Sequence, residues 1–346
     1  MTETLYTILP LHLIPMDDGV ILRRGAEKVK VTGEYAHAIV ETLVTMTKRG
    51  ERYSLNALLG EFREDLRPDI DDLLRELRER RFLMEAPEAE LEREENPADV
   101  LFWQLDRDAG TVRDALATTR LAVVGINRVS LALADGLLTG GFAHVELISH
   151  PLLNNVAIAA NAILPAGAVR HDFEAWTERD ADVDCLVATS DFGGFETMRE
   201  WNARALSGGM RFFAAVVQDA VAYLGPVVVP GSGPCFECLW SRQNSHVEEP
   251  GDRSRTEPFS FFGQYVDASL PAMGAAAGYL ASIELTRHFG RLPGYTPGTH
   301  VEVDLLAMRS VSRKLLRVPR CPVCGVHRRR PTRSVEETPI VPGNSQ

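Results

Sequence analysis

The sequence has 346 residues, of which 45% are hydrophobic and 25% are charged. This composition is ordinary for a globular protein with a substantial core. The formal net charge of -11 argues against a general binder of nucleic acid or of anionic membranes. No basic segment precedes an unbroken apolar run near the start of the chain, and no later apolar run is long enough to span a bilayer. We therefore expect a cytoplasmic protein.

Residues 1–85 are predicted to form a self-contained block of three short strands followed by three helices. Turns at Asp17-Asp18-Gly19 and Arg24-Gly25-Ala26 separate the extended runs, and apolar residues at helical spacing predict the helices. Ser54 is the expected N-cap of the second helix. We interpret the block as a winged helix-turn-helix, with strands at 12–16, 20–24 and 28–32 and helices at 34–48, 54–62 and 68–80.

Residues 86–100 are charged and poor in apolar side chains, which is typical of a linker. From 101 to 333, strand-length hydrophobic runs alternate with helical patterns, which predicts an α/β domain with a mostly parallel sheet. Within it, the polar stretch 241–258 is expected to be a loop or lid. The small-residue face of a helix at 270–289 is expected to pack in a core or against a second copy. Residues 334–346 are expected to be a disordered tail.

Four of the five cysteines form two Cys-x-x-Cys pairs, Cys235 with Cys238 and Cys321 with Cys324. Four thiolates in this pattern suit a tetrahedral zinc site, while free core thiols and a redox pair are the alternatives. A closed four-thiolate site leaves no coordination position for substrate, so we expect the metal to stabilise the fold. The fifth cysteine, Cys185, lies in an apolar strand and is predicted to be a core residue.

Residues 120–149 read as a strand, a turn, a helix and a second strand, as at the start of a dinucleotide-binding βαβ unit. The turn from Gly125 to Ser130 reads GINRVS and has one glycine where a phosphate-binding turn has three. Ile126 and Val129 are expected to place branched side chains where phosphate needs open backbone N–H groups. We therefore expect no ATP binding at this turn.

The βαβ opening is followed by DCLVATSDF, GPVVVPGSGPCFECLWSRQ and RCPVCG. This order resembles the ThiF/MoeB family of ubiquitin-activating-like adenylating enzymes over residues 101–325. In that family a glycine-rich turn and an arginine hold the ATP phosphates, an acidic residue holds the ribose, and an aspartate serves Mg-ATP. Here the turn keeps only Gly125, the ribose acid and the arginine are absent, and Asp191, Arg199 and Asn202 persist at the family's spacing. The resemblance implies a vestigial nucleotide site and no catalytic residue.

The N-terminal block is similar to PqqD-like recognition elements, which bind a leader peptide as an added strand. Such an element ahead of a degenerate ThiF-like domain resembles the Ocin-ThiF group, or F-proteins, of bacteriocin and thiopeptide biosynthesis. In these pathways a separate YcaO protein uses ATP to cyclodehydrate Cys, Ser and Thr side chains into azolines. The resemblance implies a non-catalytic, homodimeric subunit that binds structural zinc, a leader peptide and a YcaO cyclodehydratase.

We expect the leader peptide to add a strand along residues 28–32, in a groove between that strand and the third helix. Val29 and Val31 are expected to pack inward, so that Lys28 and Lys30 flank the groove. The other wall is expected to come from the third helix, through Leu74, Arg75, Leu77 and Arg78.

Two alternatives remain open. An active adenylating enzyme that acts on the C-terminus of a peptide or of a sulfur carrier would account for Asp191, Arg199 and Asn202. A winged-helix regulator would bind DNA through the arginines of the N-terminal block. Acidic residues on the same recognition-type helix would repel phosphate, namely Asp69, Asp71, Asp72, Glu76 and Glu79.

Overall fold

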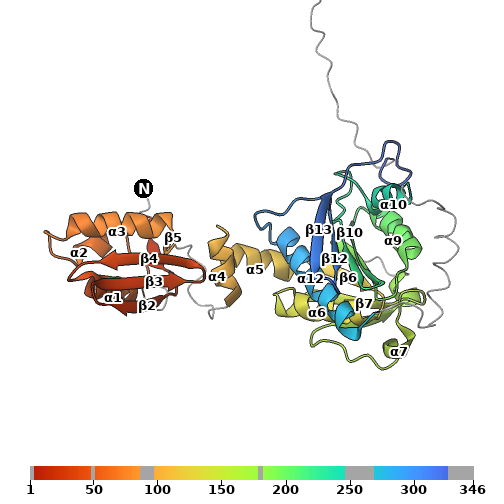
Figure 1. The fold of residues 1–346 in the computed structure, drawn as a ribbon, viewed down its shortest axis with the longest axis horizontal. Helices are drawn as coiled ribbons and strands as arrows, with labels where there is room; N and C mark the ends of the chain where they lie inside the picture. The colour runs from red at the N-terminus through yellow and green to blue at the C-terminus, as the bar shows by residue number, and fades with distance from the viewer. Residues whose placement is uncertain (1–3, 48–50, 86–96, 178–181, 246–268, 326–346) are drawn as a thin grey trace, which may run out of the picture. The chain divides into compact units, whose positions relative to one another are not determined.

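The computed structural model describes residues 4–47, 51–85, 97–177, 182–245 and 269–325 (Figure 1). The chain divides into two units. The first comprises Met1–Thr118 and Phe289–Tyr295, and the second comprises Thr119–His288 and Thr296–Gln346. Each unit has a hydrophobic core of its own.

The first unit is built on a three-stranded antiparallel sheet in the order β2-β3-β4, and helices α1, α2 and α3 contribute side chains to the same core. Val20, Leu22 and Val29 alternate along the strands and are at most 1% exposed. The side chain of Ser54 accepts from the N–H of Ala57 and caps α2, as predicted. The strands and helices expected in this block are present, with ends shifted by at most two residues. They are β2 (His12–Met16), β3 (Gly19–Arg24), β4 (Glu27–Thr32), α1 (Ala36–Met46), α2 (Leu55–Gly60) and α3 (Arg67–Glu79).

Four further elements of this unit were not expected. Strands β1 (Tyr6–Ile8) and β5 (Leu83–Glu85) pair antiparallel, and helices α4 (Pro97–Gln104) and α5 (Ala109–Thr118) follow. Residues 97–100 of the predicted linker therefore belong to α4, which buries Phe102 and Trp103. The rest of that linker, the predicted tail and most of the predicted 241–258 loop lie outside the described residues.

The second unit contains an eight-stranded sheet in the order β13-β12-β11-β10-β9-β6-β7-β8. The five strands from β10 to β8 run parallel, and the other three are antiparallel, which confirms the prediction of a mostly parallel sheet in an α/β fold. All six residues of β9 are buried, as expected for a strand covered on both faces. The strands are β6 (Arg120–Val124), β7 (His144–Ser149), β8 (Val169–Asp172), β9 (Cys185–Ser190), β10 (Arg211–Gln218), β11 (Val221–Leu224), β12 (Thr299–Asp304) and β13 (Arg309–Lys314).

Helices cover both faces of this sheet, with α6 and α12 on one side and α9 and α10 on the other (Figure 1). The helices of the second unit are α6 (Arg128–Thr139), α7 (Val156–Ala159), α8 (Phe173–Thr177), α9 (Phe195–Ser207), α10 (Phe236–Asn244) and α12 (Pro271–Phe289). Among the described residues, no helix is both long enough and apolar enough to cross a membrane.

The small-residue face of α12 packs against α6 of the same chain. A Cβ added to Gly278 would lie 2.4 Å from the carbonyl oxygen of Val129, and one added to Gly274 would lie 2.8 Å from the Cβ of Arg128. The suggestion that this face forms a dimer contact is therefore wrong, because α6 already occupies it. The outward side of α12 carries Tyr279 and Ile283, which are 46% and 54% exposed.

Candidate functional site: a closed phosphate turn and a four-cysteine cluster

The turn between β6 and α6 lies at the switch point of the parallel sheet. Strand β6 pairs with β7 on one side and with β9 on the other. In open α/β sheets, ligands bind outside the carboxyl ends of the strands at such a point. Gly125 follows β6 and Asp191 follows β9, so these two members of the predicted vestigial site meet there.

Side-chain oxygens of the protein accept hydrogen bonds from two backbone N–H groups of this turn. These N–H groups would otherwise be free to bind a phosphate. The N–H of Ile126 donates to Asn154 Oδ1 at 2.8 Å, and the N–H of Arg128 donates to Asp191 Oδ2 at 3.1 Å. The Asp191 carboxylate thus lies at the N-terminal end of α6, where the helix dipole and free N–H groups favour an anion. A phosphate could bind there only by displacing this carboxylate.

Asn127 and Ser130 close the turn from within. Each backbone N–H donates to the side-chain oxygen of the other residue at 2.9 Å, which is the capping box that begins α6. The Asn127 amide also donates to the carbonyl oxygens of Leu153 and Thr189, at 3.0 and 2.9 Å. Gly125 remains necessary here because its φ is +98° and an added Cβ would lie 2.8 Å from the Leu153 carbonyl oxygen.

The bulk of Ile126 and Val129 does not close the turn, contrary to the prediction. Ile126 and Val129 were expected to block the turn by their bulk, but both are 0% exposed and belong to the core. The polar acceptors Asn154 and Asp191 close the turn instead. Sequence reasoning missed Asn154 and its neighbour Asn155, although two consecutive asparagines soon after the second strand of a βαβ unit were a usable signal.

Both carboxylate oxygens of Asp191 accept from the Asn155 amide at 3.1 Å, in addition to the Arg128 N–H. Asp191 is 7% exposed, and burial raises its pKa, although the hydrogen bonds from Arg128 and Asn155 oppose this shift. The carboxylate that the resemblance assigns to Mg-ATP is therefore engaged within the protein.

His150 lies at the end of β7, where the resemblance implies an acidic ribose ligand. Its ring is 7% exposed and packs edge-on against Phe173 and Trp201, with centroids 4.8 and 5.6 Å away. Burial lowers the pKa of His150 to about 4, so the ring is neutral at neutral pH. Its Nδ1 accepts the N–H of Leu152 at 3.2 Å. An enclosed neutral ring cannot replace a carboxylate that accepts two ribose hydroxyls.

Arg199 and Asn202, the other predicted members of the vestigial site, contact α10. Arg199 forms a bidentate ion pair with Glu237, at 2.7 and 3.0 Å. Asn202 is 0% exposed, and its Oδ1 accepts the N–H of Phe236 at 3.2 Å. Both residues therefore tie α9 to the start of α10, which is next to Cys235.

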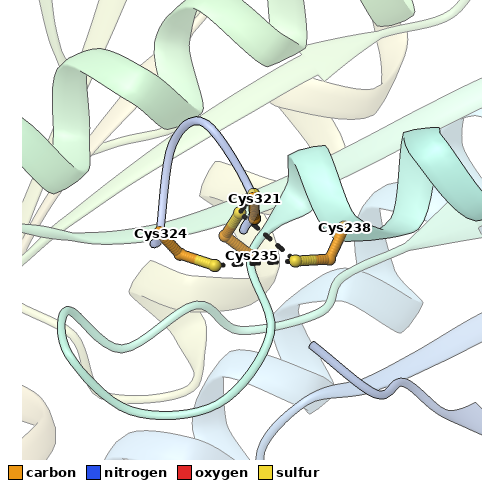
Figure 2. Close-up of side chains that lie close together, drawn as sticks. All are labelled: Cys235, Cys238, Cys321 and Cys324. Carbon is orange, nitrogen blue, oxygen red and sulfur yellow. Dashed lines mark hydrogen bonds between the residues drawn. The ribbon is translucent and has the colours of Figure 1, made fainter. Parts of the chain in front are cut away.

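The four paired cysteines lie together, as predicted. Cys235 and Cys238 are at the start of α10, and Cys321 and Cys324 come from the segment after β13 (Figure 2). All four are buried, their Sγ atoms lie within 4.8 Å of one another, and three of the Sγ–Sγ distances are 3.5, 3.7 and 3.9 Å. Tetrahedral zinc with Zn–S bonds of about 2.3 Å sets sulfur atoms about 3.8 Å apart. The cluster can therefore hold a metal ion, and its all-sulfur donor set is compatible with zinc.

The environment of the cluster favours one thiolate strongly. Hydrogen bonds to Cys238 Sγ, from the Cys235 thiol and from the N–H of Val318, lower the pKa of Cys238 to about 4. Burial raises the pKa of Cys324 to about 12. Four thiolates can coexist here only with a cation among them. Cys185 in β9 is 0% exposed and burial raises its pKa, as expected for a core thiol.

Strand β4 is an edge of its sheet within the described residues. Val29 is 1% exposed and Val31 is half-buried, whereas Lys28 and Lys30 are exposed, as expected. The N–H of Gly33 continues the ladder by donating to Asp18 at 2.9 Å. Since backbone direction alternates along a strand, the even-numbered residues of β4 direct their N–H and C=O groups away from β3.

The predicted wall of the groove differs from the observed surface. Leu74 and Leu77 are 2% and 0% exposed and belong to the core, because the apolar stripe of an amphipathic helix packs on its own sheet. Arg75 pairs with two acidic side chains of its own helix, and Arg78 lies over the Tyr6 ring, 5.7 Å from its centroid. None of these four residues is positioned as predicted.

Arg80, at the end of α3, contacts the outer edge of β4. Its Nη1 donates to the carbonyl oxygen of Lys28 at 3.5 Å, and its Nε pairs with Glu76 at 3.1 Å. Leu73 is half-buried. It lies one turn before Glu76 and two turns before Arg80, on the same side of α3. Leu73, Glu76 and Arg80 therefore replace the predicted set beside this edge.

The fold is shared with solved structures of low sequence identity. E. coli MccB in its complex with MccA-N7isoASN matches with a TM-score of 0.64 and 15% identity, over 93% of this chain and 99% of MccB. A heterocyclase in complex with substrate and cofactor matches at 0.61 and 18%, and the heterocyclase TruD at 0.59 and 20%. Each heterocyclase match covers 93% of this chain but only 40% and 43% of the respective heterocyclase. Neither a protein-family model nor a curated protein sequence matches the chain.

Proposed function

We propose that this chain is a non-catalytic scaffold of the Ocin-ThiF type. It binds the leader peptide of a ribosomally made precursor and presents the core peptide to a YcaO-type, ATP-dependent cyclodehydratase that forms azolines. The observation that carries the proposal is the closure of the phosphate turn by Asn154 and Asp191. A protein that keeps the nucleotide-binding architecture but blocks its phosphate cradle is suited to docking rather than to adenylation.

The share of each heterocyclase that the match covers supports a function together with a separate catalytic protein. This fold corresponds to 40% and 43% of the two heterocyclases, which is the relation expected for a subunit that works with a separate catalytic protein. We assign zinc, in a structural role, to the four-cysteine cluster, and we retain the homodimer as part of the proposal.

The leader peptide would pair with the outer edge of β4. We take residues 1–85 to be a PqqD-like winged helix-turn-helix, in which Lys28, Lys30 and Thr32 offer backbone groups to an added strand. Leu73 would provide an apolar contact, and the exposed lysines with Arg80 would attract acidic residues of the peptide.

Fluorescence anisotropy with the labelled leader of a candidate precursor peptide tests the proposal. Lys30→Pro removes one outward N–H and spares the ladder to β3, so it should weaken binding about ten-fold while the protein stays folded. Lys30→Ala is the matched control: it keeps the N–H and should retain most of the affinity. Val29→Pro would also disrupt the ladder and the core, so it is the poorer probe.

Equal leader binding by wild type, by Lys30→Pro and by a chain that lacks residues 1–85 would refute strand addition. Tight binding to duplex DNA in place of the leader would favour a regulator. Circular dichroism of each variant separates loss of binding from loss of fold.

The alternative is an active adenylating enzyme. Two observations favour it: 99% of MccB is covered by the match, and Asp191 is retained. Pyrophosphate exchange with ATP and the cognate peptide distinguishes the two functions. We expect no exchange by this chain alone, and robust exchange that Asp191→Ala abolishes would make the chain an enzyme.

A further inference from the structure

Strand β13 is uncovered on both faces and along one edge. All six of its residues are exposed, and within the described residues it pairs only with β12, so it ends the eight-stranded sheet. The N–H of Leu315 donates to the carbonyl oxygen of Gly298 at 2.9 Å, which sets the alternation of this ladder. The N–H and C=O groups of Ser310, Ser312 and Lys314 therefore point away from β12. A strand with such an edge is a template for a further strand.

The turn between β12 and β13 presents two large apolar side chains to solvent. Leu306 is 75% exposed and Met308 is 85% exposed. The N–H groups of Leu306 and Ala307 both donate to Asp304 Oδ1, at 3.1 and 2.8 Å, and so fix the turn. Met308 has a left-handed backbone with φ of 54°, which is costly for a residue other than Gly, Asn or Asp. Strain of this kind is concentrated at functional positions, and an exposed methionine adds nothing to the core.

The charge of this hairpin is opposite to that of the chain. Residues 305–320 contain five Arg and Lys residues and no Asp or Glu, whereas the formal net charge of the chain is -11. Arg313 pairs with Glu302 of β12 at 2.6 Å, but Lys314 and Arg320 have no ion-pair partner in the part of the chain that the structure describes. Pairing of β13 with a second copy of itself would set the cations of both copies side by side, which is unfavourable. An acidic strand is therefore the complementary occupant.

The base of the hairpin is held in place by contacts to α10. Arg242 Nε donates to the carbonyl oxygen of Leu316 at 3.0 Å, and the N–H of Val318 donates to Cys238 Sγ at 3.3 Å. Because the strand and its turn are already ordered, a partner that docks on them would lose little binding free energy to ordering them.

We propose that the β12–β13 hairpin docks a partner protein through an acidic, extended segment that pairs with β13 and contacts Leu306 and Met308. The outward backbone groups of β13 would supply the hydrogen bonds of strand addition, and its cations would select acidic side chains on the added strand. Nucleic acid or an anionic membrane would use the cations but leave the backbone groups unpaired. The hairpin belongs to the second unit and β4 to the first, so this docking does not depend on leader binding at β4.

A fluorescein-labelled peptide of ten residues, with alternating Glu and Val, is the probe. Ten extended residues span about 33 Å, so the peptide reaches beyond the six residues of β13 to the turn. Titration with the full chain should give a saturable rise in fluorescence anisotropy, and a peptide of alternating Lys and Val should give none. Ser312→Pro removes one outward N–H and spares the ladder to β12, so it should weaken binding about five-fold. Ser312→Ala is the matched control: it keeps the N–H and should bind like wild type.

Met308→Asn tests the apolar turn separately from stability. Asparagine tolerates a left-handed backbone better than methionine does, so the urea midpoint of the variant should equal or exceed that of wild type. Its affinity for the probe should nevertheless fall about three-fold, because an apolar contact is lost. Ile163→Asn is the control, because it also removes an exposed apolar side chain, 91% exposed and outside the hairpin, and it should bind like wild type.

Equal binding of the probe by wild type, Ser312→Pro and Met308→Asn would overturn docking at the hairpin, as would the absence of saturable binding to wild type. Weakening by Lys30→Pro in place of Ser312→Pro would assign the probe to β4 and overturn it too. Tighter binding to single-stranded DNA or to phosphatidylglycerol vesicles than to the peptide, lost in Lys314→Glu, would overturn the choice of a protein partner. Circular dichroism of each variant shows that the fold is retained.

Discussion

The hydrogen bonds that close the phosphate turn predict a large loss of stability in Asn127→Ala. Asn127 is 0% exposed, accepts the Ser130 N–H at 2.9 Å, and donates to the carbonyl oxygens of Leu153 and Thr189. Loss of an N-cap side chain costs about 1 kcal/mol. Buried carbonyls that lose their donor cost a further 1–3 kcal/mol, roughly. We expect the free energy of unfolding of the second unit to fall by about 2–4 kcal/mol.

Urea unfolding followed by tryptophan fluorescence in a Trp103→Phe background measures this change, because the other three tryptophans, Trp176, Trp201 and Trp240, lie in the second unit. Arg128→Ala is the matched control. It is the next residue along the turn and its side chain is exposed. Its backbone N–H donates to Asp191, and its side chain interacts with that carboxylate only through its charge. Its substitution should change the free energy of unfolding by less than about 0.5 kcal/mol.

Repeating the measurement with Mg-ATP tests whether the same bonds exclude nucleotide. A ligand present at a hundred times its Kd stabilises the folded state by about 2.7 kcal/mol. We expect no shift in the urea midpoint of wild type. An Asn127→Ala variant as stable as wild type would refute the structural role of the network, and stabilisation of wild type by ATP would refute its closure.

Three further expectations concern the metal, the buried histidine and the dimer. Elemental analysis should find one zinc per chain, and Cys324→Ser should lose it together with several kcal/mol of stability, roughly; absence of stoichiometric zinc would contradict the assignment. Burial lowers the pKa of His150 to about 4 in the folded protein, whereas a free imidazole has a pKa of about 6.5. Between these two values the unfolded state binds a proton that the folded state does not. The free energy of unfolding should therefore drop by about 3 kcal/mol as the pH falls from about 6.5 to about 4. His150→Phe should show a smaller drop in urea midpoints, and an identical pH profile would exclude this histidine as the cause. Light scattering should show a dimer that Ile283→Glu dissociates, and a monomeric wild type would contradict the dimer.

Local patterns predicted the sheet and helices of the first block because the turn residues and the alternation of apolar side chains act over a few positions. The pairing of β1 with β5 could not be predicted in this way. It joins two three-residue strands, with Tyr6 opposite Glu85 at one end. Strands this short are too brief to show a distinctive alternation of apolar and polar residues. The four cysteines were predictable because ligand type and pair spacing alone define a tetrahedral site.

The features that sequence reasoning misplaced depend on contacts between distant segments. The turn of residues 125–130 could be seen to lack glycines, but its acceptors come from Asn154 and Asp191, on other loops. The apolar stripe of α3 was correctly detected, but it was assigned to a peptide groove. Leu74 and Leu77 instead fill the core beneath the helix, since a small unit needs its apolar residues for its own stability.

Arg199 and Asn202 show why spacing alone is weak support for adenylation. Their positions match a nucleotide site, yet they bind Glu237 and the backbone of α10 and so hold the helix that carries Cys238. A structural role explains them without ATP. Of the residues at nucleotide-site positions, only Asp191 then remains to argue for catalysis, and it occupies the anion position of the turn. A carboxylate there repels phosphate, so the same residue that suggests an enzyme also accounts for the absence of a phosphate cradle.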